Sequence, residues 1–276
     1  MKVALVTGAS SGIGYETAKA LAKKDYHVYA AARNIESMSA LRAYNVKLIK
    51  LDITNHSLIQ NVVNHIIEVE GHIDILVNSA GYGSFGAVED VSIEEAKKQF
   101  EVNLFGLSEL TKAIIPSMRE QNFGKIINIS SISGRVPSCF GVWYHASKHA
   151  LEGYSESLRL ELSDFGIDVI VIAPGGIKTN WGPIAINHLQ ASSRGSVYEE
   201  QSQNMANLMD KQFKSDFLLA PSAVAKTIVK SIERPKAKPR YIVGFSAKII
   251  ILMHAILPTK LFNRIQKKQV EHSPRN

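Results

Sequence analysis

Short apolar runs alternate with longer amphipathic stretches along most of the chain. Six runs stand out, at Val3–Thr7, Val28–Ala32, Val46–Leu51, Ile73–Asn78, Lys125–Ser130 and Val169–Ala173. Continuous apolar runs of this length, rich in β-branched residues, are typical of parallel strands that are buried on both faces. A further short strand is expected at Tyr241–Val243.

The stretches between these runs repeat their apolar positions at helical spacing. They predict helices at Ile13–Lys24, Leu58–Glu70, Ile93–Met118 and Tyr144–Leu162. Alternation of strands and helices predicts an α/β fold, a doubly wound Rossmann-type sheet of seven mostly parallel strands with helices on both faces. A chain of 276 residues can bury one substantial core. We therefore expect a single catalytic domain over residues 1–276.

Two segments depart from the alternation. The polar segment 181–217 follows the last regular crossover, where open α/β sheets bind ligands. It predicts a lid over a substrate, with a plain surface excursion as the alternative. The second segment, at about 234–276, is a C-terminal extension with an apolar helix near Ile249–Leu257 and, after Pro258, a basic amphipathic helix. These helices could cover a pocket or the core, meet another subunit or touch a membrane surface.

The composition excludes several classes of protein. The net charge of +7 is concentrated late in the chain, without the fold signature or aromatic platform of a nucleic-acid-binding protein, so no nucleic-acid partner is expected. A single cysteine, Cys139, excludes an intrachain disulfide and suits a reducing compartment. No apolar run reaches the length of a membrane span. We expect a cytoplasmic protein, with association at a membrane surface as the alternative. The spacing of His, Cys, Asp and Glu does not resemble a metal site, so no metal is expected.

A glycine-rich turn separates the first strand from the first helix. It reads Thr7-Gly8-Ala9-Ser10-Ser11-Gly12-Ile13-Gly14. Glycines there let the backbone turn tightly, approach a pyrophosphate and pack the helix against the strand. The helix amino terminus offers unpaired N–H groups and the positive end of its dipole. The turn therefore predicts a dinucleotide phosphate site, with a ligand-free turn as the alternative. The residues expected to contact the phosphates are Gly8, Ser10, Ser11, Gly12, Ile13 and Gly14.

The end of the second strand bears on which dinucleotide binds. A carboxylate at this place would accept hydrogen bonds from the adenosine ribose and select NAD, but the sequence has Arg33-Asn34. Arg33 can pair with a 2′-phosphate instead. The residue favours NADP(H), with a solvated loop arginine as the alternative.

Tyr144 and Lys148 stand four residues apart in a predicted helix and therefore on one face. A free phenol titrates near 10, about three units above neutrality, so roughly 4 kcal/mol of phenolate stabilisation is needed for it to exchange a proton at neutral pH. A nearby ammonium group can supply much of this. The spacing alone is weak evidence, because Tyr15 and Lys19 also match it. We interpret that second pair as incidental.

A nearby serine, Ser131, distinguishes the Tyr144–Lys148 pair from the Tyr15–Lys19 pair. It lies just past the strand Lys125–Ser130, at the carboxyl edge of the predicted sheet, where its hydroxyl could bind a substrate oxygen beside the phenol. Ser130 and Ser133 are rivals for this role. His145 points about 100° away from Tyr144 around the helix, and we interpret it as a surface or interface histidine without a role.

These motifs, in this order, resemble those of the short-chain dehydrogenase/reductase family. The resemblance covers about residues 1 to 180 and rests on Thr7–Gly14, Asn78-Ser79-Ala80-Gly81, Asn103, Ser131, Tyr144-x-x-x-Lys148 and Pro174-Gly175. It implies a Rossmann fold with strand order 3-2-1-4-5-6-7, a homo-oligomer and a catalytic tetrad. In that tetrad Tyr144 is the acid/base and Ser131 orients the substrate. Lys148 binds the nicotinamide ribose and lowers the pKa of the tyrosine, and Asn103 holds a water in a proton relay.

The resemblance also implies further cofactor contacts. Asp52 matches the family's adenine contact and Thr179 its contact to the nicotinamide carboxamide, and Arg33 matches the NADP-preferring pattern. Ser79 departs from the family's second asparagine, while Asn78 keeps the position that supports the adenine ribose region. The remaining cofactor-binding residues implied are Ile53, Ala80, Gly81, Tyr144, Lys148, Pro174, Gly175 and Ile177. More loosely, the C-terminal extension is similar to that of members acting on retinoids and steroids.

The function expected from the sequence is an NADP(H)-dependent oxidoreductase. It would interconvert a carbonyl and an alcohol by hydride transfer, on a small and rather apolar substrate. The alternative is a catalytically silent NADP(H)-binding sensor or regulatory protein. The presence of Asn103, Ser131, Tyr144 and Lys148 together argues against this alternative, because binding alone would not require all four.

Overall fold

The computed structural model describes residues 1–215 and 217–271. Position 216 of the expected lid and positions 272–276 of the expected C-terminal extension lie outside the described residues. A seven-stranded sheet has the order β3-β2-β1-β4-β5-β6-β7, and each neighbouring pair is parallel. The Rossmann-type prediction is confirmed, with a sheet that is parallel throughout rather than mostly parallel. The strands are β1 (Val3–Thr7), β2 (His27–Ala32), β3 (Lys47–Lys50), β4 (Ile75–Asn78), β5 (Gly124–Ile129), β6 (Ile167–Pro174) and β7 (Arg240–Val243).

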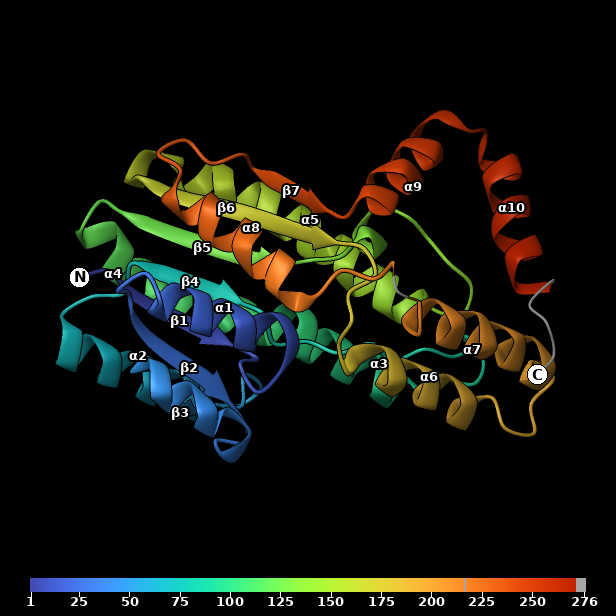
Figure 1. Cartoon of the computed structure of the whole chain (residues 1–276), viewed down its shortest axis with the longest axis horizontal. Coiled ribbons are helices and arrows are strands. Elements are labelled where there is room, and N and C mark those ends of the chain that lie inside the picture. Colours follow the sequence, from blue (N-terminus) through green and yellow to red (C-terminus); the bar gives the residue numbers. More distant parts are fainter. Residues whose placement is uncertain (216, 272–276) are drawn as a thin grey trace.

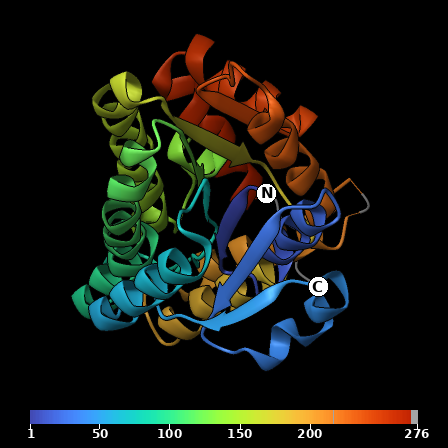
Figure 2. The same ribbon diagram turned by 90° about the vertical axis from the view of Figure 1, so that its left-hand side faces the viewer.

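Helices cover both faces of the sheet (Figure 2). Side chains alternate between the faces along each strand, so Ala4 and Val6 join one core cluster, whereas Val3 and Leu5 join the other. On the first face, α1 (Gly12–Ala22) packs against α8 (Pro221–Glu233). The second face is covered by α2 (His56–Glu70), α4 (Leu107–Glu120) and α5 (Val142–Leu162). Shorter 3₁₀ segments lie at Glu36–Tyr44, Ile132–Gly134 and Ser163–Phe165.

The helix expected at Ile93–Met118 is present, but it is not a regular α-helix throughout. The structure has α3 (Ile93–Phe100), a π-helical turn at Glu101–Gly106 and then α4. Gly106 lies so close to the neighbouring loop that a Cβ atom on it would be 2.3 Å from the carbonyl oxygen of Ile53. π-Helical turns are often found at functional sites, and this one contains the fully buried Asn103.

Four helices that follow β6 or β7 lie beyond the carboxyl ends of the strands (Figure 1). The expected lid contains α6 (Trp181–Ser192) and α7 (Glu199–Phe213). Although this segment is polar overall, its inward positions Ala185, Leu189, Met205 and Met209 form an apolar cluster. The expected extension contains β7, α9 (Phe245–Ile256) and α10 (Thr259–Glu271). Within the described part of the chain, every helix is too short or too polar to cross a membrane.

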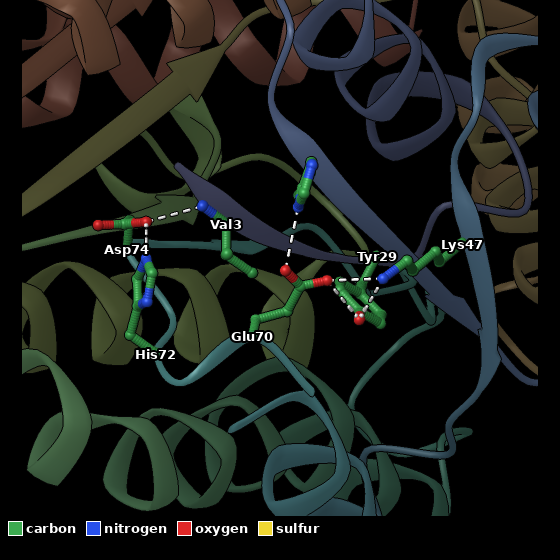
Figure 3. Close-up of polar contacts among 7 residues, drawn as sticks. Val3, Tyr29, Lys47, Glu70, His72 and Asp74 are labelled. Atoms are coloured by element: carbon green, nitrogen blue, oxygen red, sulfur yellow. Dashed lines mark hydrogen bonds and ion pairs between the residues drawn. The ribbon is translucent and has the colours of Figure 1, made fainter. Parts of the chain in front are cut away.

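Charged side chains at the amino edge of the sheet are paired with one another (Figure 3). Glu70, the last residue of α2, accepts hydrogen bonds from Lys47 at 2.6 Å and from Tyr29 at 2.9 Å. With His27 also in contact, the hydrogen bond from Lys47 holds the pKa of Glu70 at about 2. Asp74 accepts from the backbone N–H of Val3 at 2.7 Å. These contacts join α2 to β2 and β3, and they join the loop before β4 to β1.

Candidate active site

A cavity of about 730 Å³ lies at the opposite, carboxyl edge of the sheet. Its walls come from the strand ends and from α5, α6, α7, α9 and α10. The structure brings most of the expected site residues to this cavity, while Gly14, Asn78 and Asn103 are not part of its wall. The expected residues that line it are Gly8, Ser10, Ser11, Gly12, Ile13, Arg33, Asp52, Ile53, Ala80, Gly81, Ser131, Tyr144, Lys148, Pro174, Gly175, Ile177 and Thr179.

The glycine-rich turn forms one end of the cavity. Gly8 has a φ of +64°, and a Cβ atom on it would lie 2.7 Å from the backbone nitrogen of Ala80. Gly12 also has positive φ, so both positions favour glycine. Ser11 caps α1 without a side-chain hydrogen bond, and the first helical turn has no acidic residue. The N–H groups of this helix start are therefore available to an anion, and the cradle fits a pyrophosphate.

Gly14 has a different part in the turn. A Cβ atom on it would lie 2.4 Å from the carbonyl oxygen of Gly8, so glycine here lets α1 pack closely against the turn. Thr179 closes the turn from the other side, because its methyl carbon would be 3.1 Å from a Cβ atom on Gly12. Its hydroxyl accepts a hydrogen bond from the backbone N–H of Trp181 at 3.3 Å, at the start of α6.

Arg33 and Asp52 face the cavity near the ends of β2 and β3. Burial alone would raise the pKa of Asp52, but hydrogen bonds from Thr54 and the positive charge of Arg33 hold it below its ordinary value. Asp52 is therefore an anion at neutral pH. Arg33 is exposed at the end of β2, and that strand end carries no carboxylate. The arrangement suits a phosphate at Arg33 more than a bare ribose diol.

Tyr144 lies on α5 with its ring among aromatic side chains. The ring centroids of Trp181 and Phe85 are 5.0 Å and 5.6 Å away. The hydroxyl of Ser131 acts on the phenol and opposes the rise of its pKa. Of the three neighbouring serines, Ser131 is thus the one that contacts the phenol, whereas the buried hydroxyl of Ser130 has no partner among the described residues.

Burial is the largest cause of the pKa shifts of both Tyr144 and Lys148. It raises the pKa of Tyr144 to about 12, against the opposing hydrogen bond with Ser131. It lowers the pKa of Lys148 to about 8, while the carboxylate of Glu152 acts in the opposite direction. The ammonium donates to the carbonyl oxygen of Ile129 at 2.9 Å. In this structure the pKa of Tyr144 is raised, because loss of hydration outweighs the hydrogen bond with Ser131. A lowered pKa with the dinucleotide bound stays a prediction.

Asn103 and Asn78 support the cavity from behind its wall. The amide of Asn103 accepts from the backbone N–H of Tyr82 at 3.2 Å and donates to the carbonyl oxygen of the same residue at 3.0 Å. It also donates to the hydroxyl of Ser147 on α5 at 3.1 Å. Asn78 donates to the side chains of Thr111 and Asn128 in the buried interior. Both asparagines hold neighbouring segments in place.

The other end of the cavity is mainly apolar. Trp181 from α6 lies next to the Tyr144 ring, and Phe213 from α7 packs on Trp181 with ring centroids 6.1 Å apart. The remaining apolar lining comes from several separate segments, namely Phe85, Ile184, Met205, Leu208, Met209, Ile250 and Val270. Within the described residues, no cluster of His, Cys, Asp and Glu is arranged to hold a metal ion.

Residues 2–184 match the family described as short chain dehydrogenase. The chain belongs to this family. It is 38% identical over 263 residues to the probable short-chain type dehydrogenase/reductase VdlC from Helicobacter pylori, with 95% of this chain and 96% of the relative covered. It is 39% identical over 180 residues to 3-ketodihydrosphingosine reductase from Bacteroides thetaiotaomicron, covering 65% of each. A solved structure of an actinorhodin polyketide ketoreductase variant with NADPH has a TM-score of 0.75 and 30% identity, covering 89% of this chain and 97% of that one.

As a short-chain dehydrogenase/reductase, the protein is an oxidoreductase of small molecules with a nicotinamide cofactor. One residue near its candidate site was misjudged from the sequence. His145 is buried, not on the surface, and its Nε2 atom accepts from the backbone N–H of Ser138 at 3.2 Å. The ring proton therefore lies on Nδ1, which donates to the carbonyl oxygen of Ser133 at 3.0 Å.

His145 thus braces the loop that follows Ser131, and burial lowers its pKa, so the ring is neutral. Helical spacing predicted that His145 points away from Tyr144, but the two ring centroids are 6.0 Å apart in an edge contact. Spacing along a helix does not reveal such contacts. The same limit applies to Phe85, Trp181 and Phe213, which meet around the phenol only through the tertiary fold.

Proposed function

We propose that this protein is an NADP(H)-dependent reductase of small, mainly apolar ketones or aldehydes. The observation that supports this most is the place of the Tyr144 phenol. It is buried beside Ser131, in a cavity that has the glycine-rich turn at one end and apolar side chains at the other.

The proposed cofactor contacts follow from the fit of the turn. Backbone N–H groups at Gly12–Gly14 would bind the pyrophosphate, Arg33 the 2′-phosphate and Asp52 the adenine end. Thr179 and Lys148 would hold the nicotinamide end. When bound, NADPH supplies the hydride that reduces the carbonyl carbon. The ketoreductase of similar structure was solved with NADPH, which supports this choice of cofactor.

Side chains of the protein would bind the carbonyl oxygen of the substrate and donate the proton. Ser131 and Tyr144 would both donate hydrogen bonds to the carbonyl oxygen, which orients it and stabilises the developing negative charge. The phenol then gives its proton to the alkoxide, and the charged Lys148 stabilises the phenolate that remains. Asn103 holds the backbone of Tyr82 against α5, and its part in a relay water stays a proposal.

The protonation of the phenol favours the reductive direction. Tyr144 has a pKa of about 12 and is therefore protonated, the form needed to donate a proton. To act as a base at neutral pH it would first have to lose that proton, at a cost of about 7 kcal/mol. Carbonyl reduction begins from the phenol, which is the populated form of Tyr144, whereas alcohol oxidation begins from the rare phenolate.

The chamber around the phenol supports an apolar substrate. We propose that residues 181–217 act as its lid, because α6 and α7 present Trp181, Met205 and Phe213 to the cavity. Helices α9 and α10 add Ile250 and Val270. The relative named 3-ketodihydrosphingosine reductase has, by its name, a ketone substrate with a long alkyl chain. We therefore infer that aliphatic ketones bind more tightly as their chains lengthen.

Loss of NADPH absorbance with a graded series of ketones and aldehydes tests the proposal. We expect kcat/KM to rise about fourfold for each added methylene group that becomes buried, since this is worth about 0.8 kcal/mol. The Tyr144→Phe variant provides the matched control for non-enzymatic oxidation. If NADPH binds, as seen by its fluorescence, and yet no carbonyl compound is reduced, a silent NADP(H)-binding protein becomes the better description.

A further inference from the structure

Helix α9 has an apolar face that points away from the protein. Five large side chains on it are exposed, with exposed fractions of 81% for Phe245, 42% for Ile249, 58% for Leu252, 36% for Met253 and 69% for Ile256. At 100° per residue these positions fall within an arc of about 100°. They form one continuous stripe, which we call the α9 stripe.

The opposite side of α9 faces the protein. Ala247 is fully buried, and the ring of His254 packs on that of Phe262 in α10, with centroids 4.9 Å apart. Ile250 lines the active-site cavity. The helix therefore has two apolar sides, one already packed and one exposed along its length. The packed side sets the rotation of the helix, so the stripe cannot turn inward without losing these contacts.

The segment formed by α9 and α10 is strongly basic. Between residues 245 and 271 the chain has five Lys and Arg residues and one carboxylate, Glu271. The cations are exposed and lie at Lys248, Lys260, Arg264, Lys267 and Lys268. In α10 they follow the outer face, because Phe262 is buried while Gln266 and Val270 line the cavity. Figure 1 shows α9 and α10 standing away from the sheet at one end of the molecule.

We propose that the α9 stripe docks on the surface of an anionic lipid bilayer. An exposed apolar helix face beside lysine and arginine residues is the pattern that places a helix in the plane of the interface, with apolar side chains among the acyl chains and cations near the headgroups. Charge complementarity favours this partner over a second copy of the chain. A twofold contact between two such stripes would bring ten cations into one region, where they repel each other.

This placement would also bring the bilayer next to the active site. The inner faces of α9 and α10 line the cavity through Ile250, Gln266, Gln269 and Val270. A carbonyl compound dissolved in the lipid would then meet the cavity wall from the membrane side. This last step rests on the proposed function, whereas docking itself does not.

Co-sedimentation of the full chain with lipid vesicles tests the docking. We expect the protein to bind vesicles of phosphatidylcholine mixed with phosphatidylglycerol, and to bind less as salt is added or when phosphatidylcholine is used alone. In Ile256→Glu, loss of one buried apolar side chain should weaken binding at least tenfold. The matched control is Ile93→Glu. Ile93 is 53% exposed at the start of α3, where the first turn already contains Glu94 and Glu95, and this variant should bind as the parent does.

A second variant removes charge without touching the stripe. Lys248→Gln combined with Lys260→Gln should lower binding to the anionic vesicles roughly twentyfold, at about fivefold per cation. Thermal unfolding of each variant, without cofactor or substrate, shows that it is folded even if no carbonyl activity is found.

Three results would overturn the proposal. The first is no binding of the parent chain to the anionic vesicles. The second is equal binding by Ile256→Glu and Ile93→Glu. The third is an oligomer in solution that Ile256→Glu dissociates and Ile93→Glu does not, because a second copy of the chain would then be the partner of the stripe.

Discussion

Buried polar groups at the two edges of the parallel sheet differ in how their pKa values are shifted. At the amino edge, Glu70 contacts Lys47, Tyr29 and His27, and its pKa falls to about 2. At the carboxyl edge, Tyr144 and Lys148 are buried with few partners. Burial there raises the pKa of the phenol to about 12 and lowers that of the ammonium to about 8.

The difference separates groups that stabilise the fold from groups that can take part in a reaction. Where opposite charges and hydrogen bonds compensate for burial, the ionised form is favoured and the contacts hold the fold together. Where they do not, burial favours the neutral form and the group can exchange a proton during a reaction. Substitutions at the amino edge should therefore change the free energy of unfolding, and those at the carboxyl edge should change turnover.

Tyr144→Phe should have the largest effect on turnover. Removing the hydroxyl removes the proton donor, so we expect kcat for carbonyl reduction to fall more than about a thousandfold. The melting temperature should stay within about 2 °C of the parent protein, because the ring keeps its contacts with Trp181 and Phe85. NADPH affinity should be nearly unchanged. A variant that retains more than a few per cent of the activity would contradict the role of Tyr144.

The pH dependence of the two reaction directions should differ. The pKa of Tyr144 is raised, so the phenolate fraction, and with it the rate of alcohol oxidation, should rise about tenfold per pH unit between pH 6 and 8. The reduction rate should stay level between pH 6 and 7, because the phenol remains protonated and Lys148 is charged. It should fall as pH rises through about 8, the pKa of Lys148, because the ammonium loses its charge there. Single-turnover rates measured in both directions provide the test, and parallel profiles would refute it.

Arg33→Asp should reverse the preference between dinucleotides. Loss of a charge-assisted contact to the 2′-phosphate is worth about 1.5–3 kcal/mol, so the ratio of kcat/KM for NADPH to that for NADH should drop about a hundredfold. The control is Arg42→Asp, which makes the same charge change at an exposed position in the 3₁₀ segment. An unchanged ratio in Arg33→Asp would show that another group binds the phosphate.

Glu70→Gln should have the smallest effect, and only on stability. The folded-state pKa of Glu70 is lowered to about 2, so its contribution is fully present above its unfolded pKa and is lost as pH falls from about 4.5 toward 2. We expect unfolding in urea to show a loss of about 1–2 kcal/mol at pH 7, less than the full pKa shift implies, because Lys47 is half exposed. The loss should shrink at pH 3. A large drop in kcat would contradict the idea that residues at the amino edge affect stability and not turnover.

Residue patterns predicted the layered fold and most of the cavity, for a physical reason. A strand buried on both faces must be apolar, so β1 was located at Val3–Thr7, as observed. Parallel strands bring their carboxyl ends to one edge, so motifs after Thr7, Asn78 and Ile129 were expected to meet there. They do meet in one cavity.

Other features depend on contacts that periodicity does not contain. The helical pattern continues through Glu101–Gly106, so it gave no warning of the π turn. Helix α8 was missed between the lid and the extension. The polar outer faces of α6 and α7 concealed the apolar cluster that includes Met205 and Met209. The pKa shift of Tyr144 depends on how completely its neighbours exclude water, which residue spacing does not reveal.

The π turn at Glu101–Gly106 also has a consequence for how this part of the chain tolerates length changes. A π turn accommodates one residue more than an ordinary helical turn, so this turn holds an extra residue between α3 and α4. Deleting a single residue there would restore a regular helix and leave α3 and α4 at nearly their present rotation, because the wider turn exists to hold the extra residue. Asn103, inside the turn, would then shift against the backbone of Tyr82, while the helix itself would remain intact. A single codon in this turn therefore affects the support of α5 more than it affects helical content.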